Sequence, residues 1–232
     1  MKSKPNPDGK GDCKMASVEP RPPVQPGEPA PDFTLPAVER ESTVSLADYR
    51  GKSPLLLAIF RGVYCPFCRR AITKMGSIRE KLKAVGVETL GIVATNPQHA
   101  RLYFRFRPAP LPLAADPELI THWAYGLPRP AMTPELMQAV QAARINPTGE
   151  LREPLPISEA HEALDRLDGF KPSETDRQDS ERQFPQLKGQ FLVDLNGIVR
   201  WAGIECATEG PAGFGKFPTD EELLAATKAL QT

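Results

Sequence analysis

The sequence lacks a long hydrophobic run, an excess of either charge and a large number of cysteines. No stretch is long enough to span a bilayer, and the lysines near the start are not followed by the apolar segment of a secretory signal. Twenty-nine basic residues balance 29 acidic ones, so the net charge does not indicate a nucleic-acid or membrane-surface partner. We therefore expect a cytoplasmic protein with neither kind of partner.

Four cysteines and three histidines are too few for several kinds of site. Without an export signal, four cysteines do not form a disulfide scaffold, because the cytosol keeps thiols reduced. A structural zinc site needs four ligands, whereas this chain offers one close pair, Cys65 and Cys68, and scattered histidines. No metal or other cofactor is expected. The pair is either a redox centre or two inert buried thiols.

Residues 1–28 are rich in Pro, Gly and Lys and poor in large apolar side chains. Such a segment cannot bury enough surface to offset the entropy of ordering, so it is predicted to be a disordered tail. Cys13 lies in it and is expected to be a solvated thiol. The remaining 29–232 are predicted to form one elaborated domain.

The central part of the chain alternates between strand and helix signals. Two short runs, 32–38 and 43–46, suit a hairpin, and the continuous apolar run 53–60 is typical of a strand covered on both faces. From Pro66 the apolar positions recur every three or four residues and predict a helix that ends near Gly86. A further strand at 87–95 then implies a right-handed parallel crossover, with Cys65 at the turn between strand and helix.

Later segments complete a mixed α/β sheet with helices on both faces. The strongest signal is a hairpin at 189–204, joined through Asn196-Gly197, a pair that tolerates the positive φ angles of a tight turn. The other predicted elements are helices at 96–106, 117–127 and 217–230 and a short strand at 111–116.

Residues 128–187 are too long for an ordinary connection and are predicted to be an insertion. It contains two predicted helices, 133–145 and 158–167, followed by the highly polar segment 171–183. Two interpretations stay open: a surface excursion, or a lid or partner surface beside the site.

The stretch 61–70, RGVYCPFCRR, has the features of a redox centre. If Cys65 caps the helix and Pro66 is its first residue, the free amides of Phe67 and Cys68 and the helix dipole point at the Cys65 sulfur and favour the thiolate. The i, i+3 spacing places Cys68 about 5–6 Å away on the same face, near the range of a disulfide. Three arginines, at 61, 69 and 70, either add to this effect or lie on a solvated surface.

Four segments, PGEPAPDFTLPAV, VSLADYRGKSPLLLAIFRGVYCPFCRR, LAADPELITHWAYGL and GQFLVDLNGIVRW, resemble the AhpC/TSA (peroxiredoxin-like) family of the thioredoxin-like superfamily. The resemblance covers about 26–126 and 188–230. It implies a thioredoxin-like fold, antioxidant thiol chemistry and a reductant such as thioredoxin, glutaredoxin or a small thiol. Cys65 matches the attacking cysteine, and Cys68 matches the resolving cysteine of the thioredoxin-type motif.

The chain departs from the family pattern at several positions. Ala58 stands where peroxiredoxins carry a proline, and Gly62 where they carry the hydroxyl that orients peroxide. Lys188 replaces an arginine and loses its two-pronged donor, with a surface lysine as the alternative. Tyr64 stands where thioredoxins have tryptophan, and Pro185 comes several residues too early to be their cis-proline.

These features predict a peroxiredoxin-like thiol-disulfide oxidoreductase that cycles Cys65 and Cys68. The alternatives are a thiol-dependent hydroperoxide reductase with the same two cysteines, and a thioredoxin-fold binding or redox-sensing module. The substrate is thus a peroxide or a protein disulfide. Cys206 is expected to be a buried structural thiol or a second resolving group. Candidate contacts around the cysteines are Arg61, Gly62, Tyr64, Pro66, Phe67, Arg69 and Lys188.

Overall fold

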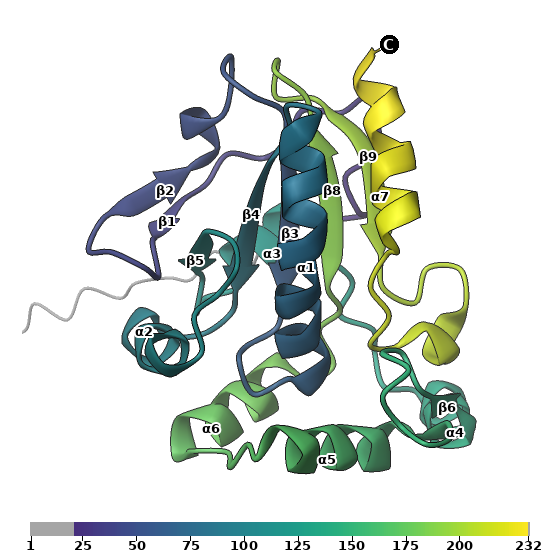
Figure 1. Cartoon of the computed structure of the whole chain (residues 1–232). Coiled ribbons are helices and arrows are strands. Elements are labelled where there is room, and N and C mark those ends of the chain that lie inside the picture. Colours follow the sequence, from purple (N-terminus) through teal and green to yellow (C-terminus); the bar gives the residue numbers. More distant parts are fainter. Residues whose placement is uncertain (1–20, 232) are drawn as a thin grey trace, which may run out of the picture.

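A computed structural model describes residues 21–231 and places a five-stranded mixed sheet at the centre of the molecule (Figure 1). Its strands run in the order β5-β4-β3-β8-β9; β3, β4 and β5 are parallel to one another, β8 is antiparallel to β3, and β9 is antiparallel to β8. The bounds are β3 Leu55–Phe60, β4 Glu88–Val93, β5 Leu113–Ala115, β8 Gly189–Val193 and β9 Val199–Ile204. The predicted central strand, parallel crossover and late hairpin are confirmed.

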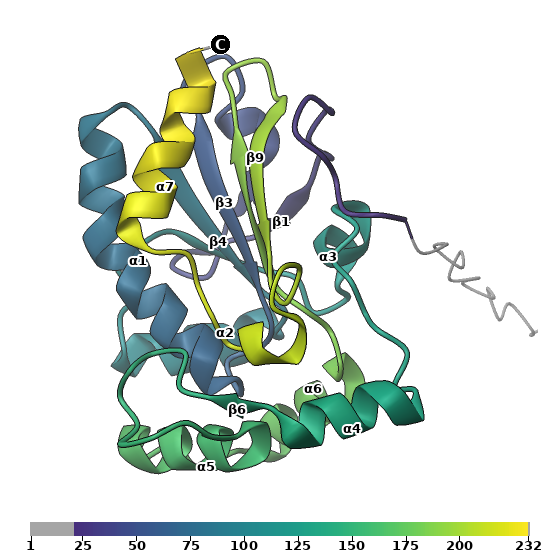
Figure 2. The same cartoon turned by 90° about the vertical axis from the view of Figure 1, so that its right-hand side faces the viewer.

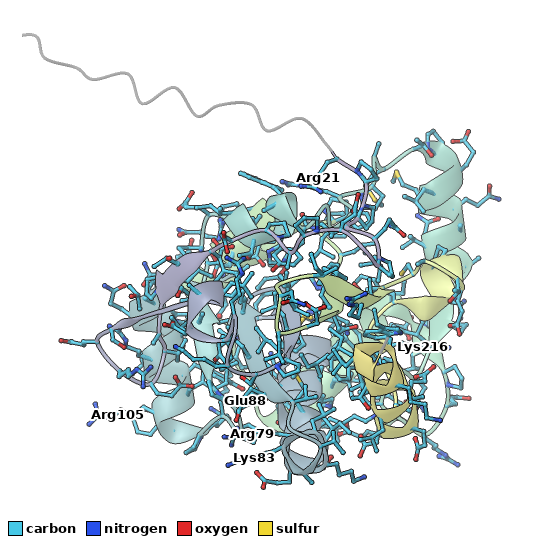
Figure 3. The ribbon with its side chains drawn as sticks, turned by 90° about the horizontal axis from the view of Figure 1, so that it is seen from above. Arg21, Arg79, Lys83, Glu88, Arg105 and Lys216 are labelled. Atoms are coloured by element: carbon cyan, nitrogen blue, oxygen red, sulfur yellow. The ribbon has the colours of Figure 1, made fainter. Side chains whose placement is uncertain are left out.

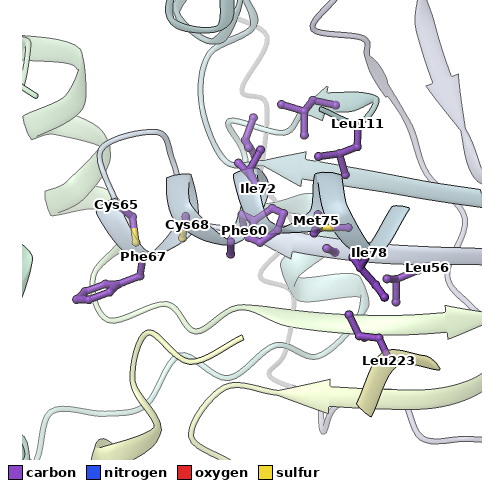
Figure 4. Close-up of a cluster of buried hydrophobic side chains, with 14 of the residues drawn as sticks. Leu56, Phe60, Cys65, Phe67, Cys68, Ile72, Met75, Ile78, Leu111 and Leu223 are labelled. Atoms are coloured by element: carbon purple, nitrogen blue, oxygen red, sulfur yellow. The ribbon is translucent and has the colours of Figure 1, made fainter. Parts of the chain in front are cut away.

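The central strand β3 is buried on both faces, as its unbroken apolar run requires. Successive side chains of a strand point to opposite faces. Leu56 and Phe60 therefore lie in the core beneath the long helix α1 (Pro66–Ala84), and Leu57 lies in the core on the other face of the sheet. Figure 4 shows Leu56 and Phe60 next to the apolar side of α1.

Helix α1 has the predicted position and orientation. Proline occupies its first turn, Cys65 is the N-cap, and Gly86 follows its end with φ +80°. Lys81 and Lys83 lie in the last turn, where positive charge interacts favourably with the helix dipole. Figure 3 looks down on this end and shows Lys83 near Arg79, at the end of the helix opposite the cysteines.

The smaller elements surround this core. The first hairpin pairs antiparallel as predicted, and Asn96 caps α2 by accepting the amides of Gln98 and His99. Helix α3 is shorter than predicted, because Leu119 has a left-handed conformation and the carboxylate of Asp116 accepts the first helical amides. The bounds are β1 Thr34–Pro36, β2 Thr43–Ser45, η1 Leu46–Asp48, α2 Pro97–Phe106, α3 Ile120–Ala124, η2 Gly210–Gly213, α7 Asp220–Ala226 and η3 Thr227–Gln231.

Residues 21–28 are held against the domain. Val24 is fully buried, and its amide donates to the carbonyl of Tyr125 at 3.1 Å. The amide of Gly27 donates to the carbonyl of Val199 at the start of β9, at 2.8 Å. The prediction of a disordered tail is therefore wrong for 21–28, because one apolar anchor and backbone pairing fix this segment. The rest of the predicted tail, including Cys13, lies outside the described residues.

The segment between α3 and β8 gathers around the N-terminal end of α1 (Figures 1 and 2). It contains the two helices expected there and a third, α6, that the sequence did not predict. The bounds are α4 Pro134–Ala142, β6 Arg144–Ile145, β7 Leu155–Pro156, α5 Ile157–Asp168 and α6 Glu174–Gln183. Within 21–231, no helix has the length and apolar character needed to cross a membrane.

Candidate active site

Cys65 and Cys68 lie together at the first turn of α1. Cys65 is the N-cap, in extended conformation, and both side chains are almost fully buried, with exposed fractions of 2% and 1%. Figure 4 shows both sulfurs on the same side of the turn, with Phe67 beside them. The Cys68 side chain lies close enough to the Cys65 sulfur to favour its thiolate.

The expected hydrogen bonds from the helix amides to Cys65 are not formed. No amide of the first turn donates to the Cys65 side chain, and the Cys68 amide donates instead to the Cys65 carbonyl at 3.1 Å. The Arg69 amide donates to the same carbonyl, also at 3.1 Å. The first-turn amides therefore act on the Cys65 sulfur through the helix dipole and not through a direct hydrogen bond.

The surroundings shift the pKa values of the two cysteines in opposite directions. Burial raises the pKa of Cys65, but the hydrogen bond from Cys68 and the positive charges of Arg61, His161 and Lys188 outweigh it, and the pKa falls well below its ordinary value. Burial raises the pKa of Cys68, and its hydrogen bond to the Cys65 thiolate raises it further. One cysteine is thus favoured as thiolate and its neighbour as thiol.

A buried network of charges surrounds Cys65. Arg61 donates to both carboxylate oxygens of Glu205, at 2.6 and 3.2 Å. The ammonium of Lys188 lies 3.6 Å from the same carboxylate and donates to the carbonyl of Gly215 at 2.9 Å. The side chains of Arg61, Glu205 and Lys188 have exposed fractions of 4%, 0% and 0%.

This network contains two cations and one carboxylate. A buried charge is costly unless an opposite charge compensates it. The Cys65 thiolate supplies the second negative charge, which makes the group of four neutral. The interpretation of Lys188 as a surface lysine is therefore wrong: its side chain is fully buried, and its ammonium lies between Glu205 and the carbonyl of Gly215.

Two aromatic rings and a loop cover the site. Phe214 meets Phe67 edge-on, with ring centroids 5.6 Å apart, and lies under the guanidinium of Arg61 at 4.5 Å. Gly215 follows with φ +83°, and a Cβ there would lie 2.7 Å from the Phe67 ring. We call 205–217 the cover segment, because it carries Phe214 and Gly215 across the site.

Cys206 belongs to the cover segment and not to the strand. It is partly exposed, follows the end of β9 and has φ +65°. The expectation of a buried structural thiol is therefore wrong. Partial burial and the neighbouring carboxylate of Glu205 raise its pKa to about 12, which disfavours the thiolate.

The backbone before Cys65 is fixed by buried polar side chains. The amide of Gly62 donates to Oε1 of Gln183 from α6 at 2.8 Å, and the amide of Val63 donates to Oγ1 of Thr95 at 3.0 Å. A Cβ on Gly62 would lie 2.8 Å from that hydroxyl oxygen. Position 62 therefore has no room for the missing hydroxyl. Tyr64 is buried beside the site, and burial raises its pKa well above the ordinary value.

Arg69 holds helix α5 against the loop of the site. Its guanidinium donates to the carbonyls of Val63 and Tyr64 at 2.9 and 3.0 Å. It also pairs with Asp165 and Asp168, at 2.5 and 2.7 Å. These acceptors take up the donors of Arg69, which gives it a structural role at the site.

Sequence reasoning missed several residues of the site. Glu205, Gln183 and Thr95 come from three distant segments, and no local motif marks them.

Pro185, which precedes β8, is joined to Phe184 by a cis peptide bond. Throughout 21–231, no group of three or more His, Cys, Asp or Glu side chains is arranged to hold a metal ion.

Solved structures with the same fold include peroxiredoxins. Peroxidoxin BcpB of Mycobacterium tuberculosis matches with a TM-score of 0.54 at 13% identity, over 90% of this chain and 97% of its own. The reduced 2-Cys peroxiredoxin of Plasmodium vivax matches with a TM-score of 0.54 at 15% identity, over 88% and 95%. At such identities the likeness shows the thioredoxin-like fold alone.

The sequence itself identifies the family. No curated protein matches the chain, but the model of the AhpC/TSA family matches residues 26–202, which include the cysteine pair, helices α4 to α6 and most of the sheet. Members of this family are usually thiol peroxidases or other thiol oxidoreductases. The chain belongs to the AhpC/TSA family.

Proposed function

We propose that this protein is a thiol-dependent oxidoreductase in which Cys65 attacks the substrate and Cys68 resolves the product into an internal disulfide. The observation that carries this proposal is the position of both buried cysteines at the first turn of α1, beside the buried cations of Arg61 and Lys188, and the opposite directions of their pKa shifts agree with it. A lowered pKa supplies the nucleophile, and a raised pKa keeps the partner protonated until it is needed.

Burial of the sulfurs favours a hydroperoxide as the oxidant. Attack on a protein disulfide requires a third sulfur to approach Cys65 in line, but Phe67 and the cover segment enclose it. A small hydroperoxide needs far less room. The lack of a peroxide-orienting hydroxyl at Gly62 favours disulfide exchange, whereas the closed site favours a small hydroperoxide. Disulfide exchange remains the second candidate and requires displacement of the cover segment.

The proposed reaction balances without any cofactor. The Cys65 thiolate attacks one oxygen of the hydroperoxide, the O–O bond breaks, and the leaving oxygen takes up a proton to give an alcohol or water. Cys65 is then a sulfenic acid. The Cys68 sulfur displaces its hydroxyl group, which leaves as water, and the disulfide forms. The hydroperoxide is reduced by two electrons, which the two thiols supply.

An external thiol must then return both cysteines to the reduced state. Thioredoxin, glutaredoxin or a small thiol would attack the disulfide, form a mixed disulfide and release the dithiol. This step needs access to a sulfur, so we expect the cover segment to move during reduction.

The test is a rapid-quench oxidation of the reduced protein, with the oxidation state of each cysteine read by alkylation and mass spectrometry. Cys65 should react with hydrogen peroxide far faster than free cysteine at the same pH. Cys68→Ser should trap the Cys65 sulfenic acid, and Cys206→Ser, which removes a cysteine outside the pair, should react like the unmodified protein.

Other outcomes would point elsewhere. Slow peroxide oxidation together with fast reduction of insulin disulfides would favour disulfide exchange, and Cys68→Ser would then trap a mixed disulfide. If neither substrate were turned over with any thiol reductant, the enzyme proposal would be wrong and a binding or redox-sensing module would be favoured.

A further inference from the structure

The inserted helix α5 brings a histidine to the redox site. The ring of His161 meets the ring of Phe67 edge-on, with centroids 6.0 Å apart and an angle of 76° between the planes. Phe67 lies between the two cysteines in the sequence and is itself buried. The His161 side chain keeps 34% of its surface exposed, so it reaches the site from the edge and can exchange protons with solvent.

The position of His161 is fixed by a chain of contacts. Its Nδ1 lies 3.4 Å from the carboxylate of Asp165, one turn further along α5. Asp165 accepts a hydrogen bond from Arg69 on α1, and Arg69 donates to the carbonyls of Val63 and Tyr64. The loop that carries Cys65 is therefore linked through Arg69 and Asp165 to the imidazole.

The charges that face His161 come from two helices. The carboxylate of Asp165 lies beside the ring on its own helix, and Arg69 on α1 pairs with the same carboxylate. From the first turn of α1, the Cys65 thiolate interacts favourably with protonated His161. Imidazole is the side chain that ordinarily changes charge between pH 5 and 8.

We propose that His161 is a positioning residue that, when protonated, stabilises the thiolate of Cys65. This inference rests on the proposed function only in so far as that thiolate is the nucleophile. His161 takes its proton from solvent, and the thiol of Cys65 releases its own proton to solvent more readily because the imidazolium stabilises the thiolate. The reactive ion pair, thiolate with imidazolium, stays populated at mildly acidic pH. The insertion thus contributes to the chemistry of the site and not only to its surface.

The test compares substitutions of His161 that differ in charge. His161→Gln removes the charge, and His161→Lys keeps it at all pH values. The readout is the rate at which iodoacetamide alkylates Cys65 between pH 4 and 9, followed by mass spectrometry of its peptide, which reports the thiolate whether or not the protein is an enzyme. Thermal unfolding identifies a variant that has lost its fold.

His99→Gln is the matched control. His99 forms the same kind of pair, with Nε2 2.9 Å from Asp176, but on α2 and α6. We expect His161→Gln to slow alkylation about 3- to 10-fold near pH 5, the effect of about half to one pKa unit, and to leave the rate near pH 9 unchanged. His161→Lys should keep the fast rate at pH 5, and His99→Gln should match the unmodified protein.

Coincident pH profiles for His161→Gln and the unmodified protein would overturn the inference. So would equal loss in His161→Gln and His161→Lys, which would mean that His161 acts only by packing. If the profiles shift as expected but neither peroxide nor disulfide is turned over, the proposed function fails and this inference stands.

Discussion

Lys188 and Glu205 should move the pKa of Cys65 in opposite directions. Lys188→Met removes a buried positive charge that favours the thiolate, so the pKa should rise. Glu205→Gln removes the only carboxylate of the buried network and leaves Arg61 and Lys188 without it, so the pKa should fall further. If Lys188 and Glu205 acted only by packing, the two substitutions would not shift the pKa of Cys65 in opposite directions.

The size of the effect follows from how the charges are shared. An opposite charge within about 4–6 Å lowers an acidic pKa by about 1–3 units, and Glu205, 3.6 Å from the ammonium of Lys188, offsets part of that charge. We therefore expect about one unit for Lys188→Met, which is ~1.4 kcal/mol. For a two-electron couple this equals about 30 mV, and the disulfide should become less oxidising, because the dithiol form loses its stabilised thiolate.

Glu205→Gln should lower the free energy of unfolding by more than Lys188→Met does. It leaves two buried cations facing each other, and removing one partner of a buried ion pair typically costs about 3–5 kcal/mol. Urea unfolding of the reduced protein measures this cost. The pKa comparison is meaningful only if the variant is folded under the conditions of the alkylation assay.

Alkylation of Cys65 against pH and redox titration against glutathione measure the two effects. Lys81→Met is the matched control, because Lys81 is exposed and pairs with Asp220 at the surface. The argument fails if Lys188→Met and Glu205→Gln shift the pKa of Cys65 in the same direction, or if neither differs from Lys81→Met.

Three further predictions concern the surroundings of the sulfur. Gly62→Thr should not accelerate peroxide reduction and should lose about 1–3 kcal/mol in urea unfolding, since its Cβ would meet the Thr95 hydroxyl at 2.8 Å; a stable, faster variant would contradict this. Gly215→Ala, strained at φ +83° and against Phe67, should loosen the cover segment, seen as faster alkylation of Cys65 at high pH and a lower melting temperature. The folded state lowers the pKa of Cys65 from an ordinary 9.0. The thiolate therefore contributes fully to the free energy of unfolding above pH 9, and this contribution is lost as the pH falls through the folded-state pKa. In urea unfolding, the stability difference between the reduced protein and Cys65→Ser should accordingly become smaller at low pH.

The parts of the fold that depend on local signals could be predicted. The apolar run of β3, the three- and four-residue spacing of α1 and the Asn196-Gly197 turn each specify a conformation through neighbouring residues. The capping box of Thr219 and Glu222 at α7 is equally local. The same holds for the position of Cys65 at the start of α1.

Helix α6 escaped prediction because it has no apolar stripe. Its buried side chains are Asp176, Asp179 and Gln183, all polar, so the usual hydrophobic periodicity is absent. The one local signal was the capping box at Ser173 and Asp176. Burial of this helix depends on partners elsewhere in the chain. The Gln183 amide group joins the segments that follow β3 and β4, because it accepts from the Gly62 amide and donates to the carbonyl of Ala94.

The charges of the site depend on a single irregularity of the sheet. The hairpin pattern fixes that β8 and β9 pair, but the register shifts by one residue next to Val193. Beyond this bulge, Lys188 faces Glu205: the Glu205 amide donates to the Lys188 carbonyl at 3.1 Å, and the Lys188 amide donates to the Glu205 carboxylate at 3.2 Å. Without the bulge, Lys188 would face Ile204, and Glu205 would shift to the other face of the strand, because side chains alternate with a period of two. A regular alternation of strand residues therefore predicts the hairpin and still misplaces the one carboxylate that binds both cations.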